Sequence, residues 1–223
     1  MAPARAAAHR AHGTERISMF MLNIAEFQGR SGKDGYRWEG EAWYGGDLNR
    51  VVLKSEGEGS FRDSLESAEI QALYARAIGP YFNLQAGVRY DVKPDPSRAY
   101  ATIGIEGLAP YWFEIDSALF LSNKGDVLGR FDAYYDQLIT QRLVLQPRVE
   151  VNLAAQDVLE NGIGSGVSDI ELGLRLRYEI RREFAPYVGI SYSRKIGNTA
   201  DFARAAGERV GSTSFIIGIR TWF

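Results

Sequence analysis

Cysteine is absent from this sequence, and histidine is almost absent. The 223 residues contain no cysteine and two histidines, His9 and His12, which both precede the first regularly patterned segment. Disulfides, zinc ribbons, iron–sulfur clusters and thiol nucleophiles are therefore excluded. Histidine-based catalysis is nearly excluded too, because no histidine lies in the patterned part of the chain. We therefore expect a protein that is not an enzyme.

A strong charge of one sign and a long apolar run are also missing. The chain carries 26 lysines and arginines against 28 aspartates and glutamates. This near balance argues against a nucleic-acid partner bound by bulk electrostatics. No stretch approaches the roughly 18 apolar residues of a transmembrane helix. The start, MAPARAAAHRAHGTE, lacks the apolar core of a secretory signal, so we expect the signal upstream or a truncated start.

Apolar and polar residues alternate along almost the whole chain from Ile17 onward. The clearest segment is 169–180, where one face is apolar and the other holds charged residues and a glycine. As a helix, this segment would spread leucines and charges around every side. A period of two instead predicts a strand with one apolar and one charged face. The apolar face comprises Ile170, Leu172, Leu174, Leu176, Tyr178 and Ile180.

Twelve such segments can be counted. Most are about 10–13 residues long, which exceeds the ~5–6 residues of a typical soluble strand and suits the ~9–11 that cross a bilayer at a tilt. Short and long connections alternate between them, as in outer-membrane barrels. We predict an all-β fold, a twelve-stranded antiparallel transmembrane β-barrel over residues 16–223, preceded by a disordered arm at 1–15. Both chain ends should lie on the periplasmic side, with essentially no helix. The segments are 16–28, 36–46, 49–58, 66–78, 81–91, 98–108, 111–121, 127–138, 142–154, 168–180, 184–195 and 212–223.

Aromatic residues distinguish this barrel from a soluble β-sandwich. Tyrosines and tryptophans gather near the segment ends, among them Trp38, Tyr44 and Trp112. Such residues form girdles at the two membrane interfaces. The chain also ends in an alternating strand closed by Phe223, which looks like the assembly signal of bacterial outer-membrane barrels. The pattern predicts the bacterial outer membrane, with its lipid as the partner of the apolar faces.

Nine stretches of the sequence carry recognisable motifs, at 41–50, 53–57, 69–74, 84–89, 107–114, 145–148, 162–166, 172–187 and 199–207. These motifs resemble the copper-resistance protein B family of bacterial outer membranes, and the resemblance covers about residues 15–223. It implies an outer-membrane barrel that works with periplasmic copper-handling proteins in copper tolerance. Copper would then be a ligand and not a catalytic cofactor. Family members usually carry a Met- and His-rich segment before the barrel, of which only His9, His12, Met19 and Met21 remain here.

The soft ligands of the chain are confined to residues 1–21. Copper(I) prefers thioether, thiolate and imidazole groups. Met19 and Met21 are two apart on a predicted strand, so both should face the lumen, with Phe20, Leu22 and Ile24 toward lipid. We predict Met19, Met21, His9 and His12 as the metal-ligand candidates. The alternative is that the two methionines only fill space in the lumen.

The predicted lumen is rich in charge. Either these groups form a salt-bridge network that narrows the barrel, or they provide a polar path for a cation with carboxylates as transient ligands. Two functions remain open. The barrel contributes to copper resistance by binding copper or passing it across the membrane, or it is a narrow general porin or structural barrel without copper specificity. A barrel enzyme would need a histidine within the strands. We read the glycine-rich stretch 162–166 as a mobile exposed loop and not as a phosphate loop. The charged lumen residues are Arg89, Arg130, Arg148, Arg175, Arg177, Glu114, Asp116, Asp132, Glu150, Asp169, Glu171 and Glu179.

Overall fold

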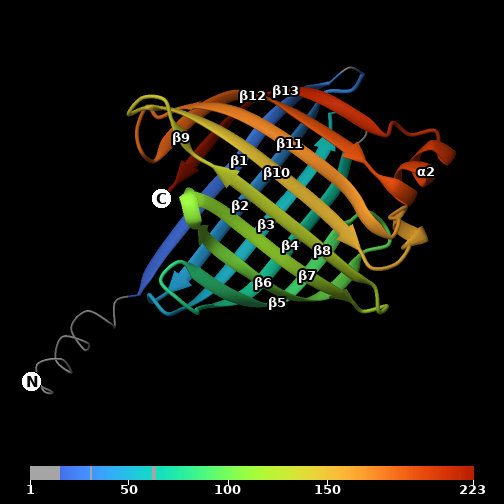
Figure 1. The fold of residues 1–223 in the computed structure, drawn as a ribbon, viewed down its shortest axis with the longest axis horizontal. Helices are drawn as coiled ribbons and strands as arrows, with labels where there is room; N and C mark the ends of the chain where they lie inside the picture. The colour runs from blue at the N-terminus through green and yellow to red at the C-terminus, as the bar shows by residue number, and fades with distance from the viewer. Residues whose placement is uncertain (1–15, 31, 62–63) are drawn as a thin grey trace, which may run out of the picture.

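The computed structural model describes residues 16–30, 32–61 and 64–223, and these form one closed β-barrel (Figure 1). β8 and β9 lie end to end against β10, so they form one barrel strand interrupted at Asp136. The barrel is therefore twelve strands around, as the sequence predicts. The strands are β1 (Ile17–Arg30), β2 (Gly35–Gly45), β3 (Asn49–Ser60), β4 (Ser64–Ala77), β5 (Phe82–Lys93), β6 (Arg98–Ala109), β7 (Phe113–Ser122), β8 (Val127–Tyr135), β9 (Gln137–Leu138), β10 (Leu143–Ala154), β11 (Gly166–Tyr178), β12 (Phe184–Lys195) and β13 (Gly211–Trp222).

Every strand pairs antiparallel with its neighbours, and the first strand closes the barrel against the last. β1 pairs with both β2 and β13, and β10 pairs with β11. At the seam, the backbone N–H of Phe20 donates to the carbonyl of Phe223 at 3.0 Å, and that of Phe223 donates back at 2.8 Å. Closure leaves no open sheet edge, which is what a β-structure needs inside a bilayer.

The two rims of the barrel differ. Tight turns join β2 to β3 and β11 to β12 at one rim, where both ends of the barrel also lie (Figure 1). The longest connections, 155–165 and 196–210, belong to the other rim. The second of these contains helix α2 (Gly197–Ala205), which the sequence prediction of essentially no helix overlooked. None of the helices in the described ranges is long and apolar enough to span a membrane.

The apolar faces point outward. On β11, Leu172 is 50% exposed and Leu174 40% exposed, whereas Arg175 is 3% and Arg177 6% exposed. A soluble protein would bury the leucines and expose the arginines. The reversed arrangement confirms that the apolar face of this strand meets lipid and that the charged face lines the lumen.

One part of the facing prediction is wrong. The pairing of β1 shifts between Leu22 and Ile24, so Asn23 forms a β-bulge. A bulge inserts one residue and exchanges the two faces of the strand beyond it. Ile24 is therefore only 3% exposed and lies on the lumen side, not toward lipid. The bulge also turns Glu26 and Gln28 inward, where both are buried.

Placing a charge on the lipid face should destabilise the barrel. Leu174→Arg is expected to lower the free energy of unfolding in lipid vesicles by roughly 2–4 kcal/mol, because arginine near the midplane loses its hydration. Urea titration of the protein in vesicles measures this difference. Leu159→Arg is the matched control, since Leu159 is 72% exposed on a long loop. Equal stability of the two variants would show that β11 is wrongly oriented.

Candidate functional site

Two rows of carboxylates run around the inner wall of the barrel, each following the direct cross-strand pairs from one strand to the next. In the β2–β5 acidic row, each acid lies directly opposite the next on the neighbouring strand. The β6–β11 acidic row has the same direct cross-strand pairing on the other half of the barrel. The first row is Glu39, Glu56, Glu69 and Asp91, and the second is Glu106, Asp116, Asp132, Glu150 and Glu171.

Like charges directly opposite each other are destabilising, so both rows need cations. The cations come largely from the facing wall. Arg37 of β2 donates to Glu150 at 2.9 Å and to Glu171 at 2.6 Å. Arg148 of β10 reaches back to Glu39 at 2.8 Å. The lumen is therefore braced by ion pairs that cross it.

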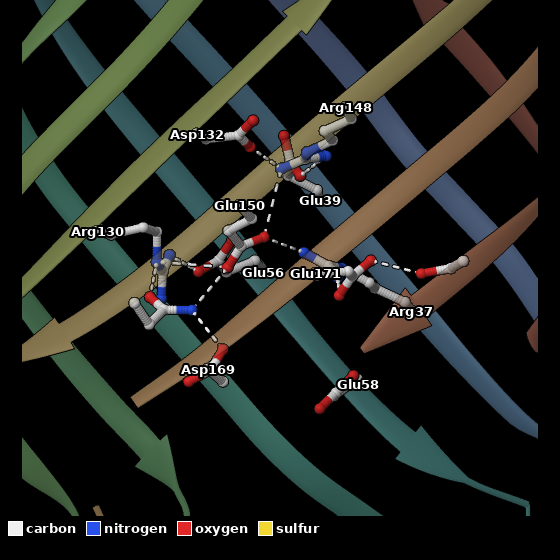
Figure 2. A network of polar contacts seen from close by, with 12 residues as sticks. Arg37, Glu39, Glu56, Glu58, Arg130, Asp132, Arg148, Glu150, Asp169 and Glu171 are labelled. Atoms are coloured by element: carbon white, nitrogen blue, oxygen red, sulfur yellow. Dashed lines mark hydrogen bonds and ion pairs between the residues drawn. The ribbon is translucent and has the colours of Figure 1, made fainter. Parts of the chain in front are cut away.

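Glu150 is the hub of this bracing (Figure 2). Besides the hydrogen bond from Arg37, it has the guanidinium groups of Arg130 and Arg148 each 3.8 Å away. Arg130 of β8 also crosses the lumen to Glu56 of β3 and to Glu69 at 3.0 Å. Three guanidinium groups thus converge on one carboxylate, which links strands on both halves of the barrel.

A second crossing uses a lysine. Lys54 of β3 pairs with Asp116 at 2.5 Å and with Glu106 at 3.2 Å on β7 and β6. Glu41 lies directly opposite Lys54 on β2, and the Gln85 side chain also donates to Glu106. One ammonium group therefore serves several carboxylates.

A buried cluster lies where the barrel closes. Arg175 of β11 reaches past β12 and β13 to Glu26 of β1, with an Nη2–Oε2 distance of 3.1 Å. The side chain of Glu26 is fully buried, and it also accepts from Tyr187 at 3.1 Å and from Gln28 at 2.8 Å. Gly218 of β13 leaves room for this cluster, because a Cβ there would lie 2.5 Å from the Tyr187 ring. The seam is thus held by side chains as well as by backbone pairing.

The long-loop half of the lumen holds a cavity of about 1100 Å³. Arg37, Arg130 and Glu150 are among its lining residues, whereas Lys54 and Asp116 are not. The cavity therefore ends at the level of the Glu150 hub. Below this level, toward the short turns, lies the lysine crossing.

The long loops are packed against each other over this cavity. The N–H of Gly164 donates to Thr199 of α2 at 2.9 Å, and Gly164 is buried. The prediction of a mobile exposed loop at 162–166 is therefore wrong at Gly164, where α2 covers the backbone. Glu160 accepts from Lys124 at 2.7 Å and from Arg98 at 2.6 Å. These hydrogen bonds hold the pKa of the Glu160 carboxyl below its usual value.

Of the four predicted copper ligands, the structure describes only Met19 and Met21, which lie close together on β1. Met19 lies opposite Trp43 and Met21 opposite Glu41 on the lumen side near the short-turn rim. The sulfur of Met21 accepts a contact from Arg220 at 3.8 Å, and a cation at this thioether would have to displace that guanidinium. His9 and His12 lie outside the described residues. Within the described ranges, no group of three or more His, Cys, Asp or Glu side chains is placed to hold a metal ion.

The sequence prediction includes the charged lumen residues of β8, β10 and β11 but not their partners on β2 and β3. The ion-paired arginines and acids on β8, β10 and β11 were predicted from their alternation. Arg37, Lys54 and Glu56 were not singled out, although they supply the crossing partners. Their own strands also alternate, since Arg37 stands between Tyr36 and Trp38, so the same signal could have found them.

The closed barrel, its outward apolar faces and its ion-paired lumen define the chain as a bacterial outer-membrane β-barrel. Known structures share this fold. The NanC porin aligns with a TM-score of 0.59 at 13% identity, covering 90% of this chain and 98% of that one. The KdgM porin aligns with a TM-score of 0.56 at 12% identity, covering 92% and 98%. In such barrels the short turns face the periplasm, which predicts that both barrel ends lie on the periplasmic side.

The particular family is shown by sequence. The family model described as "Copper resistance protein B precursor (CopB)" matches residues 16–223. Copper resistance protein B of Escherichia coli is 44% identical over 215 residues, covering 96% of this chain and 72% of that protein. A Copper resistance protein B homolog of Pseudomonas syringae pv. tomato is 38% identical over 215 residues, covering 96% and 73%. The chain belongs to the copper resistance protein B family.

Proposed function

We propose that this barrel contributes to copper resistance by binding copper ions and passing them across the outer membrane through its lumen, without catalysis. The observation that carries the proposal is the pair of facing acidic rows, which contain more carboxylates than the cations that brace them. A path lined by carboxylates favours cations over anions. Family membership identifies copper as the cation of interest.

Copper would enter or leave at the periplasmic mouth. Met19 and Met21 lie there on the lumen side, and the thioether is a soft ligand suited to copper(I). His9 and His12 precede this strand in sequence and supply further soft ligands. Periplasmic copper-handling proteins are the proposed donors or acceptors at this rim. The hard carboxylates deeper in the lumen would then carry a hydrated ion.

Removing both thioethers tests the copper ligands. Met19→Leu combined with Met21→Leu is expected to weaken Cu(I) binding roughly tenfold or more, because leucine keeps the volume and removes the soft donor. Competition titration of the purified barrel with a chromogenic Cu(I) chelator measures the affinity. The control is Phe20→Leu on the opposite face of β1, which should leave binding unchanged. Unaltered Cu(I) affinity in the double variant would contradict a role of Met19 and Met21 in copper binding.

A narrow porin or structural barrel is the alternative function, and a strain test separates the two. Deletion of the gene is expected to raise copper sensitivity while uptake of small neutral solutes stays the same. Plasmid-borne wild-type protein should restore tolerance. A deletion that changes general solute permeability and leaves copper tolerance intact would favour the porin and contradict the proposal.

A further inference from the structure

We infer that Lys54 sets the ion selectivity of the periplasmic half of the lumen, as a mobile counter-ion that an incoming hydrated divalent cation replaces. The inference rests on the proposed function, since it assumes that ions pass through this lumen. It is carried by three features of the Lys54 crossing: the type of cation, the exposure of its partners and the like charges that it separates.

The first feature is the type of cation. The crossings at the hub use the arginines Arg37, Arg130 and Arg148, each paired with acids on more than one strand. A guanidinium group is a planar, multiple donor that fixes two carboxylates at once. The ammonium group of Lys54 is a point charge on a flexible four-carbon stem, so it can change partners without breaking a bidentate geometry.

The second feature is exposure to water. The side chains of Asp116 and Glu106 are 41% and 33% exposed, whereas that of Glu150 at the hub is 11% exposed. Water therefore already reaches the acids that Lys54 serves. An ion that keeps part of its hydration shell can approach these acids more easily than those of the hub.

The third feature is the charge that Lys54 compensates. Glu106 and Asp116 are directly opposite each other on β6 and β7, and Glu41 is directly opposite Lys54 on β2. Like charges in such register repel and need a cation between them. Lys54 supplies one positive charge to this group, and a divalent ion would supply two. We expect the ammonium to turn from Asp116 toward Glu41 when an ion occupies the space between Asp116 and Glu106.

Ion selectivity measured in planar bilayers tests the inference. The full-length purified protein is placed in a KCl gradient, and the reversal potential gives the ratio of K⁺ to Cl⁻ permeability. Lys54→Gln is expected to raise this ratio by about tenfold, because the carboxylates lose their resident cation. Block of the K⁺ current by added CuCl2 should also occur at lower Cu²⁺ concentrations in this variant.

Two further variants make the result decisive. Lys54→Arg is expected to lower the conductance below that of the wild type, since guanidinium would hold both acids together. Lys124→Gln, which removes a lysine from the connection between β7 and β8 at the opposite rim, should match the wild type. Heat-modifiable gel mobility shows whether Lys54→Gln folds. If it does not fold, the conductance of Lys54→Arg tests the inference, and a conductance equal to that of the wild type would contradict it.

The outcomes separate this inference from the proposed function. In one outcome the wild-type protein conducts K⁺, and Lys54→Gln and Lys54→Arg behave in the same way as the wild type. That result would overturn the role of Lys54 and leave the proposed function standing. A wild type that tolerates copper in cells but passes no ions in bilayers would instead remove the lumen path itself. Copper tolerance of a strain that carries Lys54→Gln is measured in parallel, so that the two readouts do not depend on each other.

Discussion

Neutralising Glu150 is expected to lower the free energy of unfolding by about 3–5 kcal/mol, the cost of breaking a buried ion pair by removing one partner. In Glu150→Gln, the guanidinium groups of Arg37, Arg130 and Arg148 would lose their shared carboxylate while staying inside the barrel. Their mutual repulsion adds to the desolvation cost. Urea titration in lipid vesicles measures the change.

The matched control for the hub is Glu183→Gln. Glu183 is exposed on the short turn between β11 and β12, where loss of one charge should change stability by less than about 0.5 kcal/mol. The Glu150→Gln barrel should also lose part of its cation preference in bilayers, because the lumen then carries one negative charge fewer at this level. A stability loss below about 1 kcal/mol would show that the other carboxylates of these arginines suffice and that Glu150 is not the hub.

Breaking the seam cluster is the second change with a large expected effect. Arg175→Met leaves the fully buried carboxylate of Glu26 without its cation and should cost about 3–5 kcal/mol. The double variant Glu26→Met with Arg175→Met should recover most of this loss, because a buried pair replaced by apolar residues leaves no orphan charge. The double-mutant cycle, measured by the same urea titrations, gives the coupling between the two residues.

The seam prediction has a clear contrary result. Arg177 on the same strand is also buried, but it pairs with Asp136 at 2.6 Å, whose side chain is 30% exposed. Arg177→Met should therefore destabilise the barrel less than Arg175→Met. Equal losses at both positions would mean that the seam is held by backbone pairing and not by the Glu26 cluster.

Much of the fold could be predicted because strand periodicity is a local property. The alternation in 169–180 fixed which residues of β11 meet lipid, and the exposures of Leu174 and Arg175 agree. Ile24 could not be placed in this way. Its side depends on a bulge at Asn23, and a bulge is set by pairing with β2 and not by the composition of β1.

The candidate site was less accessible to sequence reasoning, because its contacts are distant along the chain. Arg37 and Glu150 are separated by 113 residues, and Arg175 and Glu26 by 149. Alternation predicts that Arg37, Glu150 and Arg175 face the lumen, whereas Glu26 turns inward only because of the bulge at Asn23. It does not predict which arginine meets which acid, since that depends on the register of every strand between them.

The sequence by itself determined the number of strands, the inward and outward faces of strands without a bulge, the membrane setting and the family resemblance. These follow from a period of two, from strand length and from motifs, all of which are read within a few residues. Only the tertiary structure decided that the acids align in two rows, that Glu150 collects three arginines and that the long-loop cavity ends at this level. The physical reason is that barrel closure fixes strand register, and register alone decides which charges meet across the lumen.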